Sequence, residues 1–135
     1  MKICLCQLNS TVGDLTGNVK KTLKTINDAH KRGADLIVFP EMFLSGYQLQ
    51  DLVFKEAFLN DVDQSLEYIS QNVPEGLAVL IGAPKVDDGK IYNSYFLIMS
   101  GSITLSAQKF HLPNKDIFDE ERYFAKGNMR KPIQI

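Results

Sequence analysis

The stretch Ala34-Asp35-Leu36-Ile37-Val38-Phe39-Pro40-Glu41 is a short apolar run that ends in a proline and a carboxylate. β-Branched, apolar residues in a run of this length favour a buried strand, and Pro40 favours its end because proline has no backbone N–H to donate. Ligands of open α/β sheets bind outside the carboxyl ends of the strands. The stretch therefore predicts a buried strand over residues 34–39 that carries Glu41 to an edge where chemistry can take place.

The segment before this strand predicts the first unit of an α/β fold. Residues 2–8 are apolar enough for a central strand, and residues 18–32 place their apolar side chains on one helical face. We expect Thr16 or Asn18 to cap the start of this helix and Gly33 to follow its end. Strand, helix and strand within about 40 residues indicate a right-handed βαβ unit with parallel strands.

The segment after Glu41 predicts a loop, a second helix and three further strands. The helix is expected over residues 53–72, where Pro74 stops it. The strands are expected at 77–83, ended by Pro84, and at 91–99 and 102–109, with a hairpin turn at 87–90. The fold class is therefore α/β, with a mixed sheet that begins parallel and continues through antiparallel hairpins.

The composition is that of an ordinary globular domain. The chain has 135 residues, of which 44% are hydrophobic and 23% charged, which suits about one domain. The net charge of −1 gives no electrostatic reason to expect nucleic acid or an anionic membrane as a partner. No apolar run approaches the roughly 18 residues that span a bilayer, and residues 1–8 do not resemble a signal peptide, so we expect a cytoplasmic protein. Glycine-rich phosphate-binding patterns are absent, which disfavours a nucleotide-binding Rossmann domain.

The two cysteines of the chain, Cys4 and Cys6, lie two positions apart in the first predicted strand. At this spacing both side chains point to the same face of the strand, and residues so close in sequence rarely form a disulfide. A C-x-C pair that no histidine or second cysteine pair completes is not a zinc-binding spacing. We therefore expect two small buried side chains and no metal site.

Three charged residues stand at or beyond the ends of predicted strands, namely Glu41, Lys109 and Glu120. A carboxylate and an ammonium group at neighbouring strand ends can act as a general base and a charge stabiliser in acyl transfer. The alternative is a solvated carboxylate, a solvated lysine and a glutamate that caps a loop. Spacing alone favours this alternative, because charged residues also gather at strand ends without a catalytic purpose.

Several ordered motifs resemble the nitrilase superfamily of carbon–nitrogen hydrolases. Residues 35–41 followed by Ser45-Gly46-Tyr47 resemble its first signature, and Lys109-Phe110-His111-Leu112-Pro113 resembles its lysine motif. A third segment, Glu120 with Phe124 and Gly127, resembles its later E-x-x-x-F-x-x-G motif. Within the superfamily, further pairs are similar to the glutaminase domain of glutamine-dependent NAD synthetases: Val12-Gly13-Asp14 with Gly17-Asn18, Asp51-Leu52, Leu112-Pro113-Asn114, and Phe118-Asp119-Glu120 with Arg122-Tyr123-Phe124.

The resemblance covers about residues 1–127 and implies the N-terminal part of a nitrilase-like α-β-β-α sandwich, with residues 128–135 as an uninformative tail. It implies that Glu41 is the general base, that Lys109 stabilises the oxyanion, and that Glu120 holds Lys109 and helps position the substrate. Tyr47 would line the substrate pocket.

The resemblance also implies the substrate and the partners. Glutamine would be hydrolysed to glutamate and ammonia, and the ammonia would pass to a synthetase domain that uses ATP and Mg²⁺. The glutaminase domain itself would need no cofactor. Phe39 and Tyr92-Asn93 are expected to support the fold.

The sequence departs from the family pattern in two places. The nucleophilic cysteine, expected tens of residues after the lysine motif, is not present, and Cys4 and Cys6 lie inside a strand where burial would leave a thiol unreactive. Lys115-Asp116 also stand where relatives place a tyrosine and a glycine. We therefore expect an N-terminal piece of a larger enzyme, without glutaminase activity of its own.

Two alternatives stay open. One is a stand-alone amidase of the same superfamily, for which no ATP-binding domain would follow. The other is a non-catalytic fragment or interaction subunit. In either form the chain could make a homo-oligomer through an exposed edge of its sheet, or associate through a downstream domain.

Overall fold

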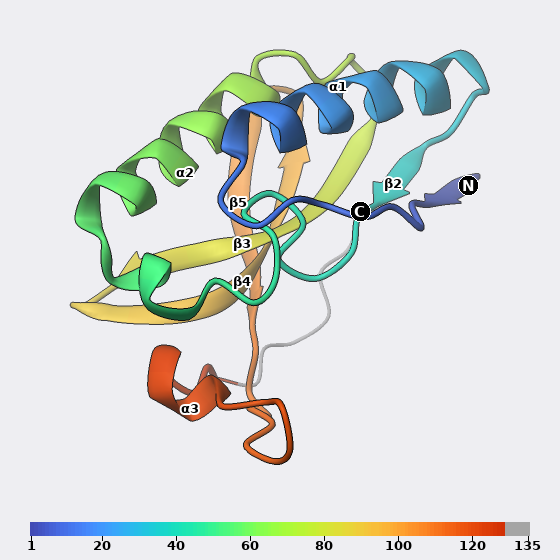
Figure 1. Cartoon of the computed structure of the whole chain (residues 1–135). Coiled ribbons are helices and arrows are strands. Elements are labelled where there is room, and N and C mark those ends of the chain that lie inside the picture. Colours follow the sequence, from blue (N-terminus) through green and yellow to red (C-terminus); the bar gives the residue numbers. More distant parts are fainter. Residues whose placement is uncertain (129–135) are drawn as a thin grey trace.

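The computed structural model describes residues 1–128, apart from the side chains of residues 105 and 106. These residues form a mixed sheet with two helices on one face (Figure 1). The predicted tail, 128–135, lies almost wholly outside the described residues. The elements in chain order are β1 (Ile3–Leu5), α1 (Leu15–Lys31), β2 (Leu36–Val38), the 3₁₀ helix η1 (Gln50–Phe54), α2 (Glu56–Ser70), β3 (Ala78–Asp87), β4 (Lys90–Met99), β5 (Ser102–Gln108) and the short α3 (Glu120–Tyr123).

The strands of the described sheet follow the chain in the order β1-β2-β3-β4-β5. β1, β2 and β3 are parallel, whereas β3, β4 and β5 are joined by antiparallel hairpins, so the predicted change of direction is confirmed. The prediction of a central first strand is wrong. Among the described residues β1 pairs only with β2, and the Leu5 side chain is 71% exposed.

Both long helices begin and end close to the predicted positions, but the cap of α1 differs. The Asp14 carboxylate accepts a hydrogen bond of 2.9 Å from the Gly17 amide, so neither Thr16 nor Asn18 caps this helix. Asn18 lies instead within the first turns and is buried. Gly33 follows the helix with φ of 71°, the left-handed conformation that glycine adopts without strain.

The strand β3 runs through Pro84, where the sequence predicted its end. Beyond Leu80 its described neighbour is β4 alone, because β2 pairs only with residues 78–80. This part of β3 is thus an edge, and a proline is tolerated there since no second strand needs its missing N–H.

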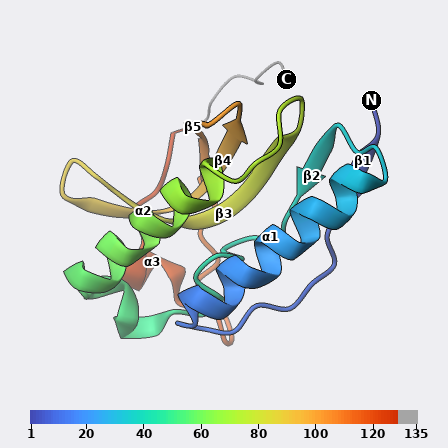
Figure 2. The same cartoon turned by 90° about the horizontal axis from the view of Figure 1, so that it is seen from above.

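Helices α1 and α2 lie side by side on the same face of the sheet (Figure 2). Their inner faces bury side chains such as Ile26 and Val62 against Ile37 and Ile81 of the sheet. The opposite face carries a second apolar cluster in which Leu36, Ala78 and Leu97 are buried and Val38 and Leu80 are partly buried. The described residues thus form a mixed α/β fold of one helical layer on one sheet. None of the described helices is both long enough and apolar enough to cross a membrane.

Candidate active site

Glu41 follows β2 by way of Phe39 and Pro40. Phe39 N still donates to Leu80 O at 2.9 Å, after which the backbone crosses over Gly82 of β3. A Cβ at Gly82 would lie 2.4 Å from Met42 N and would push this crossing away. The strand end therefore presents Glu41 as predicted, and a glycine on the neighbouring strand makes the close approach possible.

The loop after Glu41 is held in place by contacts with α1 and with the segment that precedes it. The Asn18 side chain is 1% exposed and donates to Thr11 O at 2.8 Å and to Leu44 O at 3.0 Å. Gly46 adopts φ of 81°, and a Cβ there would lie 2.5 Å from Val12 Cα. These contacts hold the loop at the carboxyl end of β2 against the segment that leads into α1.

Lys109 follows β5, which runs in the same direction as β2 and β3, so its carboxyl end reaches the same edge of the sheet. The Lys109 backbone continues the ladder on both sides. Its N–H donates to Asn93 O at 2.8 Å, and its carbonyl accepts from Gly127 N at 2.9 Å. These backbone hydrogen bonds fix the position of Lys109 independently of its side-chain contacts.

The ammonium group of Lys109 lies between two carboxylates. Its Nζ is 2.8 Å from Glu41 Oε1 and 3.0 Å from Glu120 Oε1. Burial by itself lowers the pKa of Lys109, but the hydrogen bonds and charges of both glutamates outweigh burial, and the net pKa is raised above its ordinary value. The structure therefore brings the three predicted residues together and keeps the lysine charged at neutral pH.

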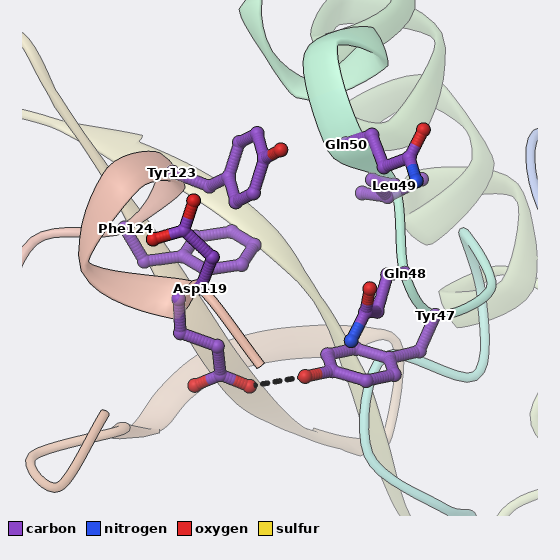
Figure 3. A pocket seen from close by; sticks show the side chains of 8 residues that line it. Tyr47, Gln48, Leu49, Gln50, Asp119, Tyr123 and Phe124 are labelled. Atoms are coloured by element: carbon purple, nitrogen blue, oxygen red, sulfur yellow. Dashed lines mark hydrogen bonds between the residues drawn. The ribbon is translucent and has the colours of Figure 1, made fainter. Parts of the chain in front are cut away.

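Glu120 is the buried member of this cluster, with a side chain that is 3% exposed. Its Oε1 also accepts a hydrogen bond of 2.7 Å from the Tyr47 hydroxyl, drawn as a dashed line in Figure 3. Its Oε2 is buried and has no hydrogen-bond partner among the described residues. Burial, and then the Glu120 contact, raise the pKa of Tyr47, so the phenol stays a proton donor at neutral pH.

A pocket beside this cluster opens between the loop after Tyr47 and helix α3 (Figure 3). It has about 280 Å³ of space, including its open mouth. Arg122 Nη2 lies 3.4 Å from Asp51 Oδ1 and joins α3 to η1 along one side. The residues that line the pocket are Tyr47, Gln48, Leu49, Gln50, Asp119, Glu120, Tyr123 and Phe124. Tyr47 lines this pocket, whereas Glu41 and Lys109 do not.

Sequence reasoning missed one contact of Glu41. Asn93 was expected to support the fold, yet its Nδ2 donates to Glu41 Oε1 at 2.6 Å, and its side chain is 5% exposed. The available signal was a pair of polar residues, Asn93 and Ser94, inside the strand that became β4. Such a signal indicates a buried polar contact but does not identify its partner, Glu41, which lies 52 residues away.

The two cysteines are not part of this cluster. Cys6 is buried and Cys4 is partly buried, and both pack against the core on the helix side of the sheet. Burial, and then the neighbouring Cys4, raise the pKa of Cys6 to about 12. Among residues 1–128 no group of cysteine, histidine, aspartate and glutamate side chains is arranged to hold a metal ion.

With this geometry established, comparison with known proteins identifies the family. Residues 2–135 match the carbon-nitrogen hydrolase family. The chain belongs to the carbon–nitrogen hydrolases. This carbon–nitrogen hydrolase is 42% identical to the glutamine-dependent NAD(+) synthetase of Rhodobacter capsulatus over 134 residues, which are 99% of this chain and 24% of that protein.

Solved structures agree with the family. A glutamine-dependent NAD+ synthetase from Acinetobacter baumannii superposes with a TM-score of 0.87 at 30% identity, over 98% of this chain and 25% of the other. An amidase from Nesterenkonia sp. gives a TM-score of 0.83 at 22% identity, over 100% of this chain and 51% of the other, and shows the shared fold. The carbon–nitrogen hydrolase described here spans about a quarter of the length of the curated relatives it matches. It corresponds to the N-terminal region of glutamine-dependent NAD(+) synthetases.

Proposed function

We propose that the chain is the N-terminal part of a glutamine amidohydrolase domain, whose ammonia serves the ATP-dependent amidation of deamido-NAD to NAD. The observation that carries this proposal is the lysine held between two carboxylates, with Nζ 2.8 Å from Glu41 and 3.0 Å from Glu120. Similarity to glutamine-dependent NAD(+) synthetases over nearly the whole chain supports glutamine as the substrate.

The proposed reaction requires a general base and a cation that stabilises negative charge. Glu41 takes the proton of a cysteine thiol, and the thiolate attacks the side-chain carbonyl carbon of glutamine. The carbonyl electron pair moves to oxygen, where Lys109 stabilises the negative charge. Collapse of this intermediate breaks the C–N bond, ammonia leaves with the proton returned by Glu41, and water then hydrolyses the glutamyl thioester to glutamate.

Glu120 and Tyr47 support the cation in this scheme. Glu120 accepts hydrogen bonds from both the Lys109 ammonium and the Tyr47 hydroxyl, so it fixes the direction in which Lys109 presents its charge. The raised pKa of Lys109 keeps that charge in place at neutral pH. Tyr47 and Glu120 also line the pocket beside this cluster.

The nucleophile in this proposal comes from outside the 135 residues. Cys6 is buried on the helix side of the sheet, and its pKa of about 12 leaves the thiol protonated. Cys4 lies in β1, two residues before Cys6, and packs on the same side. A further segment of the protein, or another chain, supplies the thiol, and ATP and Mg²⁺ belong to a separate synthetase domain. The glutaminase part itself uses no cofactor.

The face of the sheet opposite the helices is where such a segment would pack. It carries the apolar cluster of Leu36, Ala78 and Leu97, and at its edge Ile3 and Leu5 are 52% and 71% exposed. The apolar side chains exposed at this edge, Ile3 and Leu5, favour association with a second copy or with the rest of the domain. An interaction subunit would use the same face, and a monomer in size-exclusion chromatography would count against it.

A chimera tests the proposed function. Residues 1–128 of this chain replace the matching residues of the Rhodobacter capsulatus synthetase, and the release of ammonia is measured with glutamine, asparagine and acetamide as substrates. NAD synthesis from added ammonia shows in the same preparation that the chimera is folded. We expect hydrolysis of glutamine in preference to the other two amides. A folded chimera that prefers acetamide would favour the stand-alone amidase, and one that hydrolyses no amide would refute the proposal.

A further inference from the structure

Asn93 touches both of the residues that the proposed reaction requires from the sheet. It lies near the start of β4, where its side chain is buried to 5% exposure. Its Nδ2 donates to Glu41 Oε1 at 2.6 Å, and its backbone carbonyl accepts from Lys109 N at 2.8 Å. One residue of the scaffold thus sets the position of the base and of the lysine backbone.

The two carboxylate oxygens of Glu41 accept different numbers of hydrogen bonds. Oε1 accepts from Asn93 Nδ2 and from Lys109 Nζ at 2.8 Å, whereas no described residue donates to Oε2. A carboxylate oxygen that already accepts two hydrogen bonds, one of them from a cation, has less electron density to offer to a proton. The geometry therefore makes Oε2 the more basic oxygen.

We propose that Asn93 is a positioning residue that fixes the rotation of the Glu41 carboxylate and leaves Oε2 to accept the proton of the nucleophile. This inference rests on the proposed role of Glu41 as the general base. Asn93 touches no substrate in this scheme and acts through Glu41 alone.

The exposure of Glu41 explains why a second donor matters. Its side chain is 49% exposed, and it stands on a loop beyond a strand end. A single contact with the flexible Lys109 side chain would leave the carboxylate free to rotate about that contact. Asn93 donates from the strand itself, and its short buried side chain has little freedom, so the two donors together fix one orientation.

The neighbouring residue provides a matched control. Ser94 is 2% exposed on the same strand, and its hydroxyl contacts Tyr92 O at 3.4 Å, with no contact to Glu41. Ser94→Ala and Asn93→Ala remove buried polar groups at adjacent positions. A general effect on the strand would appear in both variants, whereas an effect through Glu41 would appear only in Asn93→Ala.

The first test needs no catalysis and uses the chain itself. The exchange of the Asn93 side-chain amide protons with water is followed by NMR at neutral pH. We expect these protons to exchange slowly in the wild type and faster in Glu41→Ala, which removes their acceptor. The amide protons of Asn18, which is equally buried but donates to backbone carbonyls, should exchange at the same rate in both proteins. Equal exchange rates of the Asn93 amide protons in the two proteins would overturn the inference.

The second test measures kcat and KM for glutamine in the chimera. A misplaced general base lowers the rate of the chemical step, so Asn93→Ala should lower kcat by about 10- to 100-fold with KM unchanged. Ser94→Ala should keep the kcat of the parent. Equal values of kcat in the two variants would overturn the positioning role. A chimera without any turnover would refute the proposed function instead, and the NMR result would still decide whether Asn93 holds Glu41.

Discussion

The replacement Lys109→Met removes the cation that lies between the two carboxylates. At 3.0 Å, two unit charges attract by about 5 kcal/mol at an effective dielectric constant of about 20, and the desolvation of Lys109 offsets part of this gain. Breaking a buried pair by removing one partner costs about 3–5 kcal/mol. Glu41 is half-exposed, and Tyr47 still donates to Glu120, so we expect about 3 kcal/mol, at the lower end of that range.

Urea unfolding at pH 7 measures this loss. With an m-value of about 1.5 kcal/mol/M, the midpoint should fall by about 2 M. Glu120→Gln and the double variant complete a cycle in which the two changes are coupled, because Lys109→Met is less harmful once Glu120 is neutral. The control is Lys24→Met, which removes an exposed ion pair of α1 and should leave the midpoint unchanged. A loss below about 1 kcal/mol in Lys109→Met, or additive effects in the cycle, would show that Lys109 does not bridge the two carboxylates.

The pKa of Lys109 gives this stabilisation a pH dependence. Because its pKa in the folded protein is raised above the ordinary value of 10.5, the contribution is fully present below that value and is lost as the pH rises through the raised pKa. The difference between wild type and Lys109→Met should therefore be constant near neutral pH and shrink above about pH 10.5.

Three other changes test the surroundings of the site. Asn18→Ala leaves the Thr11 and Leu44 carbonyls without their donor, and it should lower the free energy of unfolding by about 2 kcal/mol; an unchanged value would contradict the buried contacts. Gly82→Ala places a Cβ against Met42 N and should cost about 2 kcal/mol or more in unfolding experiments, whereas a neutral result would show that the crossing can shift freely. Cys6 should resist iodoacetamide at pH 8, where a pKa of about 12 leaves about one thiolate in 10,000, and rapid labelling seen by mass spectrometry would contradict its burial.

The sequence predicted the elements that depend on local patterns. The apolar run before Glu41, the amphipathic period of α1 and the turn at 87–90 were sufficient to place strands, helices and the mixed sheet. The order of strands is not a local property, so the position of β1 at an edge of the described sheet was missed. The predicted strand end at Pro84 was wrong for the same reason, because a proline ends a strand only where a neighbouring strand needs the N–H that proline lacks.

The candidate site was also predicted only in part, since some of its contacts join residues far apart in the sequence. Positions at or beyond strand ends identified Glu41, Lys109 and Glu120 as candidates, and the family motifs suggested a role for each. The burial of Glu120 to 3% exposure follows from the convergence of Tyr47 and Lys109, which lie 73 and 11 residues away along the chain. Asn93 reaches Glu41 across 52 residues, a contact that depends on the pairing of β2 with β3 and of β3 with β4.

The most direct test of the central claim is the rate of glutamate release from glutamine by the chimera, compared with its Glu41→Gln variant. We expect turnover in the chimera and a loss of at least about 100-fold in Glu41→Gln, with NAD synthesis from added ammonia intact in both. The 135-residue chain alone should release no glutamate, because it lacks a reactive thiol. Equal rates in the chimera and its Glu41→Gln variant, or turnover by the purified chain alone, would contradict the account.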